Sequence, residues 1–142
     1  MAKSFIKYRN SNIIIHDNYV TIIAKFLIKA ARQEKLVTWQ KKMIDDLIII
    51  SLGAYSGCKN LYLNEYLESE FRIKSFIGWI EKAKNELDTF RPFLTKEYLN
   101  SLEYFEQSRI TWVVDLEVDL LIGLLENIKE MILKESHASA SL

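Results

Sequence analysis

Carboxylates recur at helical spacing in the last third of this chain. Asp115, Asp119, Glu126 and Glu130 are separated by four, seven and four residues, so a single helix would carry all four on one face, with Glu117 at its flank. A line of carboxylates complements lysine and arginine side chains and speeds their approach. The spacing therefore predicts either a docking surface for a basic protein partner or a solvated face that pairs with cations of the same chain.

Trp112 directly precedes the acidic stripe. The chain has three tryptophans, each on a different expected helix, and large aromatic side chains usually pack in helical cores. Tryptophan is also enriched at the centre of protein interfaces. We expect Trp112 to be either a core residue or an anchor for the same partner as the carboxylates.

Catalytic motifs are weak in this sequence. Two Ser-x-x-Lys tetrads occur, Ser4 with Lys7 and Ser56 with Lys59, but the Ser-Asp-Asn and Lys-Thr-Gly motifs that accompany such a nucleophile are missing. Glycine-rich loops of the phosphate-binding kinds are absent as well. We attribute both tetrads to chance.

The histidines and the cysteine are isolated in the sequence. His16 and Asp17 are adjacent, so on a helix they would point about 100° apart, and helix capping explains them better than acid–base chemistry. Two distant histidines and one cysteine cannot supply a zinc or di-iron site. Cys58 beside Lys59 is expected to be inert rather than an activated thiol. We therefore expect no enzyme activity, metal or cofactor, unless scattered residues assemble a pocket.

Glycine and proline are scarce in the elements that must position these residues. The 142 residues include four Gly and one Pro and are 49% hydrophobic, a composition that permits long helices with buried apolar faces. The sequence predicts an all-α fold, a single-domain irregular bundle of five or six helices over residues 1–135, with a flexible tail at 136–142.

Apolar spacing and capping residues place the helices. Asp17, Thr38, Ser69 and Thr95 are expected N-caps, and the last helix, starting near 108 or 109, would turn Val113 and Leu120 inward. Only residues 12–15 form a β-branched run that favours an extended segment. The expected helices cover residues 17–35, 38–54, 60–67, 69–90, 95–106 and 108–135, and those over 60–67 and 69–90 could also form one bent helix.

The net charge of zero conceals an asymmetry. Residues 1–42 contain nine basic and two acidic residues, whereas residues 97–142 contain three basic and nine acidic ones. Lys25, Lys29 and Arg32 share a face of the first expected helix and suggest an alternative function, a helical nucleic-acid-binding regulator. The pI of about 6.7 argues against nucleic acid as the partner.

In size, composition and acidic last helix, the whole chain resembles the small bacterial immunity proteins that neutralise toxin domains, including those of contact-dependent growth inhibition. The likeness involves no sequence motif. The resemblance implies a protein that binds a nuclease-like toxin and blocks its basic substrate site, with carboxylates in place of phosphates. Asp115, Glu117, Asp119, Glu126 and Glu130 would make the contact, with Trp112 as an anchor.

A cytoplasmic location fits the sequence. No signal peptide is recognisable, one cysteine excludes an internal disulfide, and the longest uncharged stretch, Leu47 to Cys58, is well short of the ~20 residues that span a bilayer. We expect no membrane partner. A homodimer through Leu- and Ile-rich helix faces remains an open alternative.

Overall fold

The computed structural model describes residues 3–53, 60–104, 106 and 111–140. The chain starts with a β-hairpin, β1 (Lys3–Tyr8) and β2 (Ser11–His16), joined by a two-residue turn in which Arg9 has a φ of 53°. β3 (Leu61–Tyr62) adds to the other side of β1 in parallel, so the sheet order is β2-β1-β3. β4 (Phe93–Leu94) and β5 (Leu116–Glu117) form a second, antiparallel pair.

Five helices lie among the described residues. They are α1 (Asp17–Ala31), α2 (Thr38–Ser51), α3 (Glu70–Asp88), α4 (Lys96–Ser101) and α5 (Val118–Ala140). Together with the sheets of three and two strands they make an α+β fold. The all-α prediction, an irregular helical bundle, is therefore wrong.

The missed hairpin has a physical explanation in β1. Strands with one buried face are recognised by alternating apolar and polar residues, and here Lys3, Phe5 and Lys7 are exposed while the residues between them are buried. The exposed Phe5 and the buried Ser4 both break that pattern in the sequence. Ser4 is tolerated inside because its hydroxyl donates to the buried carboxylate of Asp17 at 2.5 Å.

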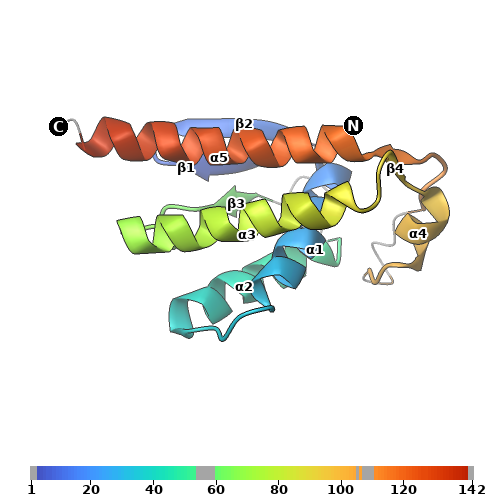
Figure 1. The fold of residues 1–142 in the computed structure, drawn as a ribbon, viewed down its shortest axis with the longest axis horizontal. Coiled ribbons are helices and arrows are strands. Elements are labelled where there is room, and N and C mark those ends of the chain that lie inside the picture. Colours follow the sequence, from blue (N-terminus) through green and yellow to red (C-terminus); the bar gives the residue numbers. More distant parts are fainter. Residues whose placement is uncertain (1–2, 54–59, 105, 107–110, 141–142) are drawn as a thin grey trace.

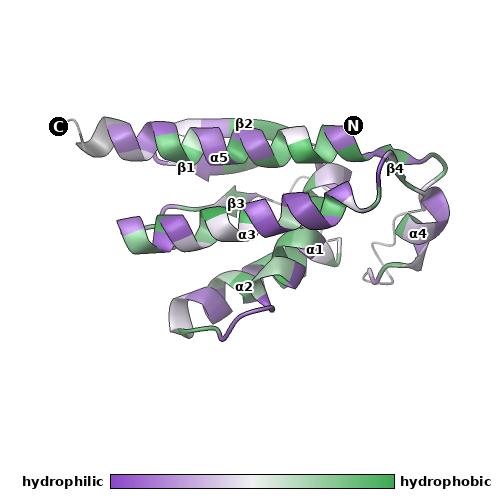
Figure 2. Ribbon diagram, viewed as in Figure 1, coloured by the Kyte–Doolittle hydropathy of each residue, from purple (hydrophilic) through white to green (hydrophobic). Residues whose placement is uncertain are grey.

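The helices cover one face of the larger sheet and pack on one another. α5 contacts both β1 and β2, α3 contacts α5 and α1, and α2 packs against α1 (Figure 1). Along α3 and α5 the hydrophobic and hydrophilic residues recur in turn, as helices with one buried side require (Figure 2). One core of buried side chains runs through all these elements.

Several expected helix ends are confirmed. Ser69 caps α3 by accepting from the Arg72 N–H, and Thr95 caps α4 by accepting from the Tyr98 N–H. The N-caps expected at Asp17 and Thr38 are wrong by one position, because the N-cap of α1 is His16 and that of α2 is Val37, so Asp17 and Thr38 are the first helical residues. The short helix expected over residues 60–67 is wrong, because this segment contains β3 and turns.

The last helix begins later than the sequence predicts. α5 starts at Val118 instead of near residue 108, and residues 111–115 form no helix or strand. Val113 is 76% exposed and Leu120 is 39% exposed, so neither has the inward position expected for it. At its other end α5 runs through Ala140, into the segment expected to form a flexible tail.

Candidate partner-binding surface

The later start of α5 divides the predicted acidic stripe. Asp119, Glu126 and Glu130 lie on the helix at spacings of seven and four, so they do share one face. Asp115 and Glu117 precede the helix and lie in and beside β5. The structure therefore places the five carboxylates in two environments instead of one.

The first environment is the seam between α3 and α5. Asp119 pairs with Arg91, just beyond α3, and Glu126 accepts from Lys84 at 2.6 Å. The reverse pair, Lys129 with Glu81, spans 2.7 Å. Positions rise along α5 as they fall along α3, so the helices are antiparallel and these ion pairs link them side by side (Figure 1).

The pKa directions in the seam follow from these contacts. The hydrogen bond to Glu126 raises the pKa of Lys84, and the hydrogen bond from Lys129 lowers the pKa of the Glu81 carboxyl. Each shift means that the charged form is favoured by its partner. Asp119 and Glu126 thus each pair with a cation of the same chain, and the side chains of Asp119 and Glu130 are both exposed.

The second environment is the outer face of β4–β5. Phe93 lies directly opposite Glu117 in the strand pair, while Leu94 and Leu116 form the buried pair beneath them. Because side chains alternate between the faces of a sheet, Phe93 and Glu117 point outward together. Asp115, next to β5, is exposed and accepts from the backbone N–H of Lys96 at 2.9 Å.

Exposed apolar side chains accompany these two carboxylates. Phe93 is 44% exposed, and Val113 and Val114 are 76% and 64% exposed. Exposed apolar side chains grouped beside charges are typical of interaction surfaces, because the apolar groups gain from being covered. We call Phe93, Val113, Val114, Asp115 and Glu117 together the β4–β5 surface.

Trp112 supports this surface from below. Its side chain is only 8% exposed, and its indole N–H donates to the Tyr104 hydroxyl at 3.2 Å. Its backbone N–H donates to the Asn100 side chain at 2.7 Å, and its carbonyl accepts from the same amide at 2.9 Å. The tryptophan fixes the segment that leads into β5, with most of its ring covered by the chain itself.

Sequence reasoning missed the apolar part of the surface. Val113 was assigned to a buried helix face, and neither Phe93 nor Val114 was singled out. The adjacent valines gave no usable signal, because consecutive apolar residues such as Ile22 and Ile23 of α1 are also buried on helix faces.

The basic face of α1 is largely engaged. Lys29 pairs with Glu86 of α3, and Lys25 donates to the Glu103 carbonyl and lies 4.6 Å from the centre of the Tyr104 ring. Burial lowers the pKa of Lys25. Arg32 is exposed, just beyond the end of α1.

The candidate catalytic pairs are not assembled in the structure. Ser4 is buried against Asp17, whereas Lys7 is exposed on the other face of β1. The ring of His16 accepts from the Asn18 N–H at 3.2 Å, a capping contact. Ser56, Cys58 and Lys59 lie outside the described residues. Among the residues described, no three His, Cys, Asp or Glu side chains gather as metal ligands would.

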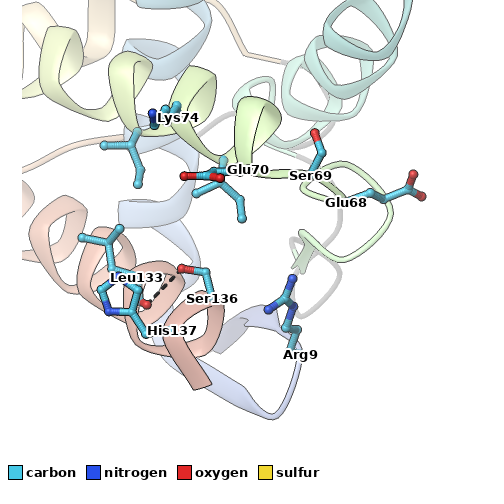
Figure 3. A pocket seen from close by; sticks show the side chains of 10 residues that line it. Arg9, Glu68, Ser69, Glu70, Lys74, Leu133, Ser136 and His137 are labelled. Atoms are coloured by element: carbon cyan, nitrogen blue, oxygen red, sulfur yellow. Dashed lines mark hydrogen bonds between the residues drawn. The ribbon is translucent and has the colours of Figure 1, made fainter. Parts of the chain in front are cut away.

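A cavity of about 460 Å³ lies between the start of α3, the end of α5 and the hairpin turn (Figure 3). Its walls carry both signs of charge, from Arg9, Lys74, Glu68 and Glu70. The Arg9 guanidinium donates to the Glu135 carbonyl at 3.0 Å. Both serines of the cavity contact backbone groups of their own helices.

Comparison with protein-family models, with curated proteins and with solved structures found no match to this chain. None of the helices in the described part of the chain has the length and hydropathy that a bilayer crossing requires. The β4–β5 surface is accordingly interpreted from its own chemistry.

Proposed function

We propose that this protein is a cytoplasmic binding protein of the immunity type, which neutralises a nuclease-like bacterial toxin by covering its basic substrate site. One observation carries the proposal: Asp115 and Glu117 are exposed beside exposed Phe93, Val113 and Val114. This combination suits a protein partner whose surface carries lysine and arginine side chains with apolar side chains between them.

The chemistry of the toxin explains why carboxylates would be used. A nuclease that grips phosphates presents lysine and arginine side chains, and carboxylates complement them without being substrates. The charges would steer the encounter and set the orientation. Burial of Phe93 and the two valines would supply much of the affinity, because apolar surface leaves water.

We centre the contact on fewer carboxylates than the sequence suggests. Asp119 and Glu126 already have cationic partners of their own, so a toxin would have to displace those partners to use them. Glu130 lies twelve residues into α5, about 18 Å along the helix from Val118. The proposal therefore centres on Asp115 and Glu117, with Asp119 and Glu126 beside them, and leaves the distal Glu130 outside the contact.

Growth rescue tests the proposal. The C-terminal domain encoded by the reading frame immediately upstream is expressed from an inducible promoter in a bacterial host, with or without this chain. We expect the domain to arrest growth, the wild-type chain to restore it, and the Asp115→Lys/Glu117→Lys variant to fail at equal expression.

Asp45→Lys/Glu130→Lys is the matched control. It changes the net charge by the same amount at two other exposed carboxylates, on α2 and on the distal part of α5. We expect this control to rescue growth like the wild type. Equal rescue by both double variants would remove the β4–β5 surface from the interface, and a harmless upstream domain would contradict the immunity function itself.

A further inference from the structure

β2 is an edge strand without the usual protection. In the order β2-β1-β3 it lies at the border of the sheet, and its six residues, Ser11 to His16, include no Lys, Arg, Asp, Glu or Pro. Natural proteins commonly place a charge or a proline on such an edge, because open backbone groups otherwise recruit another strand. The other edge strand, β3, has only two residues.

The hairpin register shows which backbone groups face this open edge. Tyr8 and Ser11 close a two-residue turn, and such a closing pair is hydrogen bonded. Hydrogen-bonded and non-hydrogen-bonded pairs then alternate, which makes Phe5 and Ile14 a non-hydrogen-bonded pair. The N–H and C=O groups of Ile14 therefore point away from β1, as do those of Asn12.

Side chains on the same strand favour a partner that is also apolar. Ile14 is 57% exposed on the sheet face opposite α5, and its cross-strand neighbour Phe5 is 42% exposed. A strand added to the β2 edge would cover the open flank of Ile14. The inner face carries Ile15, which is buried in the core.

We propose that β2 pairs with β2 of a second copy of this chain, antiparallel and about a two-fold axis at Ile14. The strand is self-complementary around that residue: reading outward in either direction, one isoleucine is followed by one uncharged polar residue. Ile14 would face its own counterpart, and Asn12 would face His16 of the second copy. A two-fold interface requires this kind of self-complementarity, whereas a foreign strand does not.

The charges of the hairpin permit this pairing. β2 carries none, and the nearest lysines of the exposed face, Lys3 and Lys7, lie on β1. In the dimer the two β1 strands would be three strand spacings apart, roughly 14 Å. This distance exceeds the Debye length of about 8 Å at physiological ionic strength, so repulsion between the two sets of lysines is screened.

Analytical ultracentrifugation of the wild type, Ile14→Lys and Ile49→Lys over a hundredfold concentration range tests the proposal. Ile49 is the matched control, since it is an isoleucine on α2 with 53% exposure. We expect the wild type and Ile49→Lys to dimerise alike, and Ile14→Lys to raise the dimer dissociation constant by about tenfold or more, because it places a charge on the pairing edge. Circular dichroism checks that each variant is folded.

Amide hydrogen exchange, followed by NMR, measures whether the backbone N–H groups at the β2 edge are hydrogen bonded, and it needs no substitution. The Asn12 and Ile14 amides should become protected as the concentration rises, whereas Ile13 and Ile15, which bond to β1, should be protected at every concentration. A wild type that stays monomeric throughout the range overturns the proposal. A dimer that survives Ile14→Lys, or whose Asn12 and Ile14 amides stay unprotected, overturns it as well.

Discussion

The α3–α5 seam and the β4–β5 surface use the same residue types in opposite ways. In the seam, Glu126 and Glu81 each have a lysine of the facing helix within 2.7 Å. At the β4–β5 surface, Asp115 accepts a hydrogen bond from the backbone N–H of Lys96, and the exposed Glu117 lies beside exposed apolar groups. The comparison teaches that a carboxylate's surroundings decide what it can do: in the seam it joins two helices, whereas at the β4–β5 surface it is exposed beside apolar side chains.

The largest expected difference between the two regions is in the loss of stability when one apolar side chain is truncated to alanine, Leu125 in α5 or Val113 in the β4–β5 surface. Leu125 has no exposed surface on the core side of α5, so the cavity left by its removal should lower the free energy of unfolding by about 2–5 kcal/mol. Val113→Ala, at 76% exposure, should change it by no more than about 0.5 kcal/mol. Urea denaturation measures both, and similar losses would mean that Val113 is covered in solution.

Asp115→Lys/Glu117→Lys should slow association with the proposed partner, the domain encoded by the upstream reading frame, by about tenfold or more at low salt, because the variant repels a cationic partner. Asp45→Lys/Glu130→Lys should have a much smaller effect. Stopped-flow fluorescence measures both rates. The gap between the variants should narrow as salt is added, and a gap independent of salt would exclude electrostatic steering as the cause.

A double-mutant cycle on Lys84→Ala and Glu126→Ala should give a coupling energy of about 0.3–1 kcal/mol, the range for partly exposed ion pairs. The parallel cycle on Lys96→Ala and Asp115→Ala should give a coupling near zero, because Asp115 bonds the backbone of Lys96 and not its side chain. Thermal or urea unfolding of the variants supplies the energies. Equal coupling energies in both cycles would contradict the claim that the carboxylates of the two regions differ in their side-chain partners.

Acid should weaken the seam through Glu81. Its pKa in the folded protein is lowered by the hydrogen bond from Lys129, so its stabilising contribution is complete above the ordinary value of 4.5 and is lost as the pH falls through the lower folded value. Glu81→Gln should therefore flatten the acid limb of the unfolding free energy against pH. Lys129→Met should flatten it similarly, and an unchanged slope in both variants would contradict the assignment.

Local signals in the sequence predicted much of the helical structure. Ser69 and Thr95 are short polar residues ahead of apolar stripes, and both cap helices where expected. The β1–β2 hairpin was not predicted, because its turn residue, Arg9, adopts a positive φ, which in a sequence is usually indicated by glycine or asparagine. The buried Ser4 and the exposed Phe5 also depart from the alternation of apolar and polar residues by which a strand is recognised.

Only part of the candidate site could be predicted from local sequence signals. The spacing of Asp119, Glu126 and Glu130 correctly placed them on one helix face, since periodicity is a local property. The cations that pair with Asp119 and Glu126 are Arg91 and Lys84, which lie 28 and 42 positions earlier in the chain, and no pattern within α5 encodes those contacts. Val113 was misplaced because residues 116–117 pair with β4, so that α5 begins only at Val118.

The contact of α5 with the hairpin has a consequence for biosynthesis. α5 covers strands that are translated long before it, and Arg9 and Ser11 both bond to Glu135. On the ribosome, the apolar side of β1 and β2 is fully shielded only after α5 has also been translated. A product released early, after α4, would expose that side and become a substrate for proteases and chaperones.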